Sequence, residues 1–411
     1  MDHHNPLQHS SSESLWRLFT IFLRLGTTSF GGPVAHIAYF RATFVERLAW
    51  LTPARFAELL ALCQFLPGPA SSQLGMAIGA SRAGIRGAIV AWLGFTLPSA
   101  LLMLGAGRLF QTHPEWLPGA LLHGLKVMTI AIVVQALLGM GRMLCQTRLQ
   151  IALMLLSTLL ALASPGISGQ LAALLCSALT GALFSAKGRG STPQAIDALN
   201  FASLRVALCS LLLFFMLLLL LPLLAQHSRS LALTMLDLFY RAGALVFGGG
   251  HVVLPLLQSE LVTTGWIDIE RFLAGYGLAQ ALPGPLFTFS AFLGAAMLPG
   301  SAGWWLGGLA LLAIFLPSFL LVVGTLPLWE RLREQPVIRH LLSGLNASVV
   351  GLLLAALIDP IGVSAITGVM DLLWAAMGFI VLQRSHLPVW AVVAGGSVLI
   401  WLFSSLIQIA Q

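Results

Sequence analysis

One set of motifs occurs twice in this chain of 411 residues, and it constrains the fold more than any other feature. The first copy reads RLGTTSFGGP, WLTPARF and QFLPGP, and the second reads RAGALVFGGG, WIDIERF and QALPGP. Phe30 aligns with Phe247, and the matches continue in order as far as the LPS triplets that end at Ser99 and Ser318. The chain therefore contains an internal duplication.

The composition indicates a membrane protein. Hydrophobic residues make up 58% of the sequence and charged residues only 9%, and long apolar stretches such as Leu204 to Leu224 occur. A water-soluble domain of this length could not keep such a sequence monomeric. The net charge of +7 does not indicate nucleic acid binding, because most basic residues lie between apolar segments, where the positive-inside rule explains them.

Apolar runs and helix breakers predict an all-α polytopic membrane protein with two inverted homologous repeats and roughly 13 apolar segments. The expected divisions are a polar N-terminal tail at 1–14, a first transmembrane repeat at 15–186, a polar linker at 187–202, a connecting transmembrane helix at 203–225 and a second, inverted repeat at 231–411. The tail lacks a basic segment and a small-residue cleavage site, so the first apolar segment is expected to be retained.

The path of the motif segments through the membrane has two interpretations. Pro69 to Ala80 and Gly84 to Phe110 are expected to be separate apolar segments. Val34 to Val45 would form a helix only about 18 Å long, too short for a hydrocarbon core of about 30 Å. The FGG and LPGP segments therefore either cross fully or turn back as re-entrant hairpins, and the positions of the arginines favour hairpins. Either arrangement puts the N-terminus in the cytoplasm and the C-terminus in the periplasm.

The helix breakers in each copy predict an anion site. Proline and glycine interrupt a helix, and the helix that begins after a break directs unpaired N–H groups and about half a positive charge toward it. Irregular backbone is tolerated at membrane depth only where it faces protein or water, so the breaks are expected to converge on one midplane cavity. The expected backbone residues of this site are Gly31, Gly32, Pro67, Gly68, Pro69, Gly248, Gly249, Pro283, Gly284 and Pro285.

An arginine precedes the FGG motif in both copies, at Arg24 and Arg241. A charged side chain costs about 2.5–3.5 kcal/mol at the bilayer centre, so a duplicated arginine implies a partner. The planar guanidinium fork suits two oxygens of a tetrahedral anion, and we expect both arginines to bind one. The alternative is that they snorkel or bind helix carbonyls. Asp237 is expected either to form an intrahelical pair with Arg241 or to hold it until substrate or a proton displaces it.

Polar side chains near the LPGP motifs have two interpretations. Gln64 and Gln280 either donate hydrogen bonds to the substrate or join helices. Ser71, Ser72 and Thr288 follow the motifs and either donate to the substrate or cap the new helix.

Coupling or gating candidates lie at the motif edges. The arginine of each WLTPARF or WIDIERF motif either anchors a helix start or draws anions toward the pore. Each histidine near an FGG motif is either packed structurally or coupled to protons. The candidates are Asp237, His36, His251, Arg55 and Arg271.

The order FGGP then QFLPGP, repeated as FGGG and QALPGP, closely resembles the chromate ion transporter family in its long form with two fused homologous halves, over nearly the whole chain. The resemblance implies a multi-pass protein of the bacterial inner membrane that exports chromate, with sulfate as a close analogue. The sequence departs from the doubled pattern at Gly250, where the first copy has Pro33. The expected partners are a chromate or sulfate-like oxyanion and the lipid bilayer, and a homodimer is left open.

Several reaction classes are excluded by motifs that the sequence lacks. It has no GxxxxGKS loop, so direct ATP hydrolysis is not expected, and no HExxH motif or other catalytic constellation, so an enzyme is not expected either. The four cysteines have no metal-like spacing, and neither a metal nor a cofactor is expected. The sequence therefore predicts a secondary active transporter that works by alternating access. The alternative is a transporter or channel for another anion, such as sulfate or an organic anion.

Overall fold

The computed structural model describes residues 14–30, 32–113, 119–164, 167–184, 203–228, 230–246, 253–329, 336–385 and 387–410, and every regular element in them is a helix. The elements before residue 203 are α1 (Leu15–Thr28), α2 (Gly32–Arg41), η1 (Ala42–Arg47), α3 (Pro53–Phe65), α4 (Ala70–Thr112), α5 (Gly119–Leu144), α6 (Arg148–Ala163) and α7 (Ile167–Phe184). Those after it are α8 (Leu204–His227), α9 (Leu231–Leu245), α10 (Val253–Leu261), α11 (Ile269–Ala281), η4 (Leu286–Thr288), α12 (Phe289–Met297), α13 (Gly300–Thr325), η5 (Leu326–Leu328), α15 (Pro336–Ala356), η6 (Leu357–Gly362), α16 (Val363–Ala365), α17 (Val369–Arg384) and α18 (Val389–Ala410).

Six helical stretches in the described residues are long and apolar enough to cross a membrane: Ala70–Thr112, Gly119–Arg142, Leu204–His227, Gly300–Leu328, Ser343–Ala365 and Val389–Leu406. The outer surface is also apolar. On α8, the side chains of Leu212 and Leu219 are 69% and 67% exposed. Backbone polar groups are satisfied within each helix, so such a surface suits lipid. The chain is thus an all-α, multi-pass membrane protein.

α4 turns back on itself instead of forming one long rod. Its backbone leaves helical geometry at Ala83 and at Gly84, which has a φ of +61°. A Cβ atom on Gly79 would overlap the carbonyl oxygen of Gly87, so the two arms lie backbone to backbone. The turn falls between the two segments expected from the sequence. Gly300, with a φ of +64°, begins α13 at the corresponding turn after α12.

The elements that carry the FGG motifs are short. α1 has 14 residues, or about 21 Å of helix, and α2 with η1 reaches from Gly32 to Arg47, about 24 Å. Both lengths are below the roughly 30 Å of a hydrocarbon core. Neither element is therefore long enough to cross the membrane as a single straight helix.

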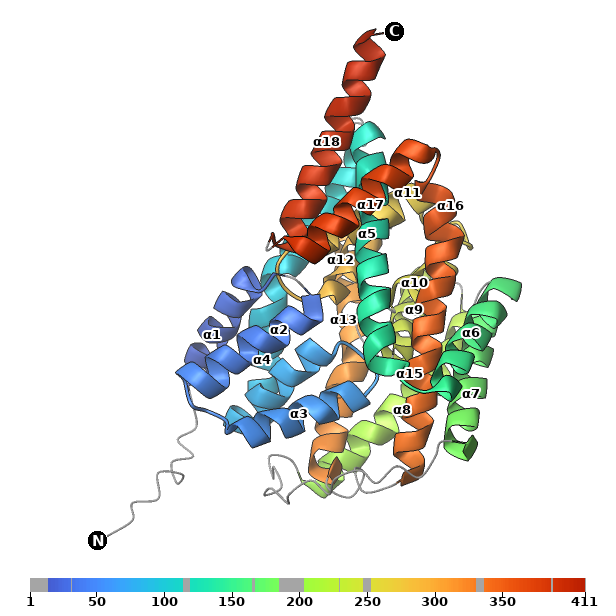
Figure 1. The fold of residues 1–411 in the computed structure, drawn as a ribbon. Helices are drawn as coiled ribbons and strands as arrows, with labels where there is room; N and C mark the ends of the chain where they lie inside the picture. Colours follow the sequence, from blue (N-terminus) through green and yellow to red (C-terminus); the bar gives the residue numbers. More distant parts are fainter. Residues whose placement is uncertain are drawn as a thin grey trace.

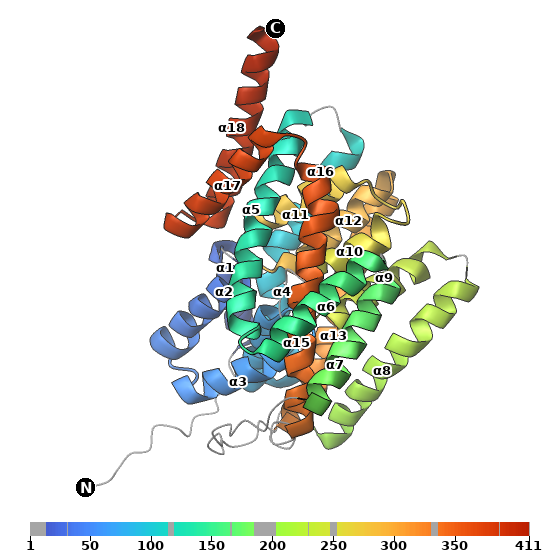
Figure 2. The same cartoon turned by 45° about the vertical axis from the view of Figure 1, so that its right-hand side comes forward.

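The two parts of the chain are interlocked. α15 packs on α6 and α7, whereas α5 packs on α17 and α18, and Figures 1 and 2 show α5 and α15 side by side between these pairs. Close approach depends on small residues. A Cβ atom on Gly124 would lie 2.8 Å from Cα of Ser397, and one on Gly344 would overlap the carbonyl oxygen of Ser177. Nearer the motifs, α4 packs against α1, α12 and α13, and α13 against α9.

Candidate functional site

Each LPGP motif separates two helices. One follows α3 and precedes α4, and the other follows α11 and precedes η4. Gly68 and Gly284 have φ angles of +117° and +98°, which glycine adopts without the steric cost that other residues incur. Pro69 and Pro285 are the N-cap residues of the new helices. The motifs therefore place a helix start beside an irregular stretch of backbone.

The breaks of the two halves are joined in a crossed manner. The amide of Gly68 donates a hydrogen bond of 2.6 Å to the carbonyl of Val246, which directly precedes the second FGG motif. The amide of Gly284 donates one of 3.0 Å to the carbonyl of Ser29, which directly precedes the first FGG motif. Each LPGP break thus contacts the entrance to the FGG motif in the other half.

The serines of the LPS triplets complete this crossed contact. A Cβ atom on Gly284 would lie 2.7 Å from Oγ of Ser99, and one on Gly68 would overlap Oγ of Ser318. Again each glycine faces a residue of the other half. Close backbone approach explains why glycine is needed in addition to the positive φ.

His36 connects three elements of the first break. Its Nε2 lies 3.2 Å from the carbonyl oxygen of Ser29, which can only accept, so Nε2 carries the proton. Nδ1 of the neutral ring then accepts from the Ser71 hydroxyl at 3.3 Å. The ring is 1% exposed and packs edge-on against Phe95. These contacts favour the structural interpretation of His36.

Several buried polar atoms at the end of α1 and in α4 have no hydrogen-bond partner among the described residues. These include Oγ of Ser29, Oγ of Ser72, Oε1 of Gln73 and Oγ1 of Thr96. Native proteins rarely leave such groups unpaired, so they mark a place where a polar ligand can be held. In the second half, the Thr288 hydroxyl donates to the carbonyl of Pro285 at 2.9 Å and its neighbours in the chain are phenylalanines.

The first break is therefore the more polar of the two. Ser72 was expected to be either a donor or a cap, and its hydroxyl makes no capping hydrogen bond in the structure. The roles of Ser29, Gln73 and Thr96 carry no sequence signal, because single polar residues in apolar runs are common.

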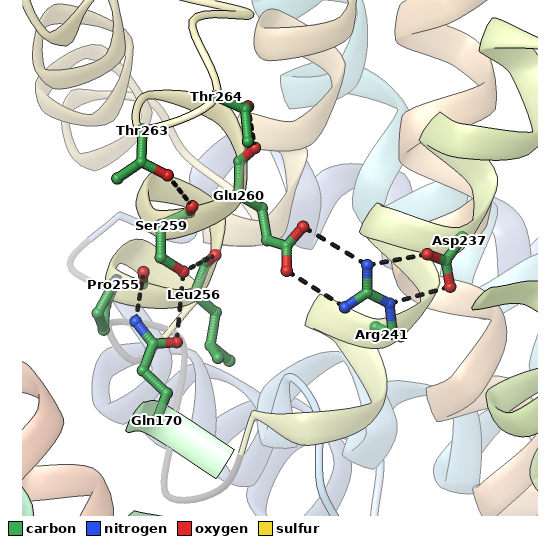
Figure 3. A network of polar contacts seen from close by, with 9 residues as sticks. All are labelled: Gln170, Asp237, Arg241, Pro255, Leu256, Ser259, Glu260, Thr263 and Thr264. Atoms are coloured by element: carbon green, nitrogen blue, oxygen red, sulfur yellow. Dashed lines mark hydrogen bonds and ion pairs between the residues drawn. The ribbon is translucent and has the colours of Figure 1, made fainter. Parts of the chain in front are cut away.

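The two aligned arginines have different surroundings. Arg24 is exposed on α1 and forms no ion pair with a described residue. Arg241 forms the intrahelical pair with Asp237, at 2.8 Å between Nη2 and Oδ2, and also pairs with Glu260 at 3.2 Å between Nη1 and Oε1 (Figure 3). Glu260 was not predicted, because it comes from another helix, α10.

The arginines at the helix starts have local partners. The amide of Arg55 donates to the Thr52 side chain, and its guanidinium pairs with Glu58. The amide of Arg271 donates to Asp268 at 2.8 Å, and its guanidinium pairs with the same carboxylate at 3.2 Å. Both residues thus contribute to the first turn of α3 or α11, as the anchoring interpretation requires.

The remaining candidates are unequally placed. Gln64 is exposed on α3, whereas Gln280 is buried on α11. Gly32 has a φ of +74° at the start of α2. Gly31, Gly248, Gly249, His251 and the linker at 187–202 lie outside the described residues.

Comparison with known proteins identifies relatives over most of the chain. The chain is 30% identical over 398 residues to a chromate transport protein of Pseudomonas aeruginosa, covering 94% of this chain and 92% of that protein. It is 28% identical over 359 residues to a chromate transport protein of Cupriavidus metallidurans, covering 84% and 82%. A shorter relative, the uncharacterized transporter YwrA of Bacillus subtilis, is 31% identical over 162 residues, which are 38% of this chain and 88% of YwrA. No solved structure matches the chain.

The family model described as "Chromate transporter" matches two regions, residues 16–182 and 233–401. These regions contain the two copies of the FGG and LPGP motifs, in agreement with the resemblance that the motifs carry. The chain belongs to the chromate transporter family.

Proposed function

We propose that this protein is a secondary active transporter that exports chromate, or a similar tetrahedral oxyanion such as sulfate, across the bacterial inner membrane by alternating access. The observation that carries the proposal is the crossed pair of hydrogen bonds, from Gly68 to Val246 and from Gly284 to Ser29. Transporters built from repeats bind their substrates where broken helices of both repeats meet. The crossed bonds supply such a meeting point.

The proposed site combines helix starts, hydroxyl groups and arginines. The first turn of α4 offers backbone N–H groups and the unpartnered Ser72 hydroxyl, which suit an oxyanion. Arginine adds the planar fork that binds two oxygens. The proposed substrate-binding residues are Arg24, Arg241, Gly31, Gly32, Gly248, Gly249, Gln64, Gln280, Pro67, Gly68, Pro69, Pro283, Gly284 and Pro285. Asp237, His36, His251, Arg55 and Arg271 are the proposed coupling or gating residues.

We further propose that the two halves have opposite orientations, with α8 as the connecting span, and that the roughly 13 segments place the N-terminus in the cytoplasm and the C-terminus in the periplasm. The basic residues between segments support this topology through the positive-inside rule. A cytoplasm-negative potential of 100 mV favours expulsion of an uncompensated dianion by about 4.6 kcal/mol. Export therefore needs no ATPase.

The site assignment is tested by chromate flux in inside-out vesicles that carry Arg24→Gln or Arg241→Gln. A hydrogen bond to a charged group contributes about 1.5–3 kcal/mol, so each variant should lose about tenfold or more in apparent affinity. Arg41→Gln is the matched control, because Arg41 is an exposed arginine whose partner is Glu46. Normal transport by both site variants would contradict the assignment.

The alternative function is transport of another anion class. Backbone N–H groups and hydroxyls arranged around a break suit a tetrahedral oxyanion, which presents oxygens in several directions, better than a planar carboxylate. Sulfate should therefore compete with chromate for the purified protein, whereas mono- and dicarboxylates should not. Competition by carboxylates alone would favour an organic anion transporter.

A further inference from the structure

Arg241 is held between two carboxylates that belong to different helices (Figure 3). Asp237 on α9 accepts from Nε at 2.9 Å and from Nη2 at 2.8 Å. Glu260 on α10 accepts from Nη1 at 3.2 Å and from Nη2 at 3.5 Å. Four of the five N–H donors of the guanidinium are thus engaged. Neither planar edge is available to bind two oxygens of a substrate anion.

The position in the first half that corresponds to Glu260 holds a neutral residue. In the first half, the backbone amide of Trp50 donates to the carbonyl of Phe44 at 2.8 Å. In the second half, the backbone amide of Trp266 donates to the carbonyl of Leu261 at 2.9 Å. Arg24 and Phe44 are separated by the same number of residues as Arg241 and Leu261. Thr43, which precedes Phe44, is therefore the counterpart of Glu260.

The second carboxylate is missing from the first half as well. Thr20 stands four residues before Arg24, where Asp237 stands before Arg241. Its hydroxyl donates to the carbonyl of Arg17 at 2.9 Å. The counterparts of both acidic neighbours of Arg241 in the first half are thus the threonines Thr20 and Thr43.

We propose that Glu260 is an internal competitor for the oxyanion: its carboxylate occupies the edge of Arg241 to which the substrate binds, and it must leave before Arg241 can bind substrate. This inference rests on the proposed oxyanion transport. A carboxylate and an oxyanion present two oxygens to a guanidinium with the same geometry, so the exchange preserves the hydrogen bonds of Arg241.

Glu260, not Asp237, is the carboxylate that leaves. Asp237 lies four residues from Arg241 on the same helix and makes the shorter contacts, with its side chain only 7% exposed. Glu260 makes the longer contacts, and its side chain is 18% exposed. A rotation of the Glu260 side chain frees one edge of Arg241 while Asp237 keeps the other edge in position.

α10 is held in place by contacts that do not involve Glu260. Nε2 of Gln170 on α7 donates a hydrogen bond of 3.0 Å to the carbonyl of Pro255 on α10. The hydroxyl of Ser259, also on α10, donates to Oε1 of Gln170 at 3.4 Å. Ser259 also borders a cavity of about 260 Å³ between α7, α10 and α15. The charged residue that lines this cavity is Asp359, which follows α15. Asp237, Arg241 and Asp359 are thus the charged groups placed around the Glu260 segment among the described residues.

The charge of the cluster also opposes oxyanion binding. Arg241 with its two carboxylates carries one net negative charge, which repels a dianion. Removal of the Glu260 charge should therefore raise the affinity for an oxyanion.

The test measures sulfate and chromate affinity of the purified full-length protein at mildly alkaline pH. Glu260→Gln should bind sulfate about tenfold more tightly than the wild type, within the usual range of coupling between competing groups. Glu46→Gln, which alters an exposed carboxylate paired with Arg41, should leave the affinity unchanged.

A variant in the first half provides a second measurement. Thr20→Asp on the exposed face of α1 places a carboxylate four residues before Arg24 and should weaken sulfate binding at alkaline pH. If the wild type binds sulfate or chromate but Glu260→Gln matches it in affinity, the competitor role is refuted. If the wild type binds neither anion, the proposed transport function fails and this inference fails with it.

Discussion

Arg24 and Arg241 occupy aligned positions in the two copies, yet the structure surrounds only Arg241 with carboxylates. The same inequality recurs at the breaks. The first turn after the first LPGP motif contains Ser71, Ser72 and Gln73, whereas the second has phenylalanines and Thr288. An arginine without a carboxylate and hydroxyls without partners both lie in the first half. Residue by residue, the proposed site is more polar in the first half than in the second.

Ser72→Ala separates a binding role from a structural one. Ser72 is 2% exposed, and its hydroxyl has no partner among the described residues. Removal of an unsatisfied buried hydroxyl should leave the Tm unchanged or raise it. Loss of a hydrogen bond to an oxyanion should cost about 1.5–3 kcal/mol of binding free energy, or about tenfold or more in affinity. Both quantities can be measured by anion titration and thermal unfolding of the purified protein.

Ser290→Ala is the matched control for this substitution. The Ser290 hydroxyl is fully buried and donates to the carbonyl of Phe287 at 2.8 Å. The control should lose about 1 kcal/mol of stability and keep its affinity. A Ser72→Ala protein that binds sulfate and chromate as tightly as the wild type would remove Ser72 from the site.

Among the elements, the helix breaks follow from the residues at them. Proline removes a backbone donor and glycine readily adopts positive φ angles, so the interruptions near Gly68 and Gly84 could be predicted from the sequence. The partners that the residues at these breaks and at Arg241 contact could not be predicted. The bond from Gly68 to Val246 joins different halves, and Glu260 reaches Arg241 from another helix. Such contacts arise from tertiary packing, which the composition of a local segment does not encode.

Gly68→Ala should destabilise the protein by about 1–3 kcal/mol, because a φ of +117° is strained for alanine and its Cβ would overlap Oγ of Ser318. Thermal unfolding in detergent and chromate flux should both decline. Gly105→Ala is the control, because no atom lies near a Cβ at that helical position, and its stability should stay the same or rise by about 1 kcal/mol.

A second substitution tests the contact across the halves. Ser318→Ala removes the overlapping oxygen, so it should restore part of the stability lost in Gly68→Ala while the backbone strain remains. A double variant no more stable than Gly68→Ala would contradict the close approach of Gly68 to the second half.

The whole molecule is held together by exchange of helices between its parts. α15 lies against α6 and α7, and α5 lies against α17 and α18, so neither half completes its own packing.

Division of the chain within residues 187–202 should therefore give two fragments that are stable only together. Expressed alone, each fragment leaves the apolar faces of its last helices uncovered and should aggregate on extraction. Expressed together, they should copurify through a tag on one fragment and restore chromate flux. Gly344→Leu in the second fragment should abolish copurification, because a side chain there would overlap the carbonyl oxygen of Ser177 in the first. Gly308→Leu, at a helical position with open space, should not. Copurification that survives Gly344→Leu, or a first fragment that is monodisperse alone, would contradict the interlocked arrangement.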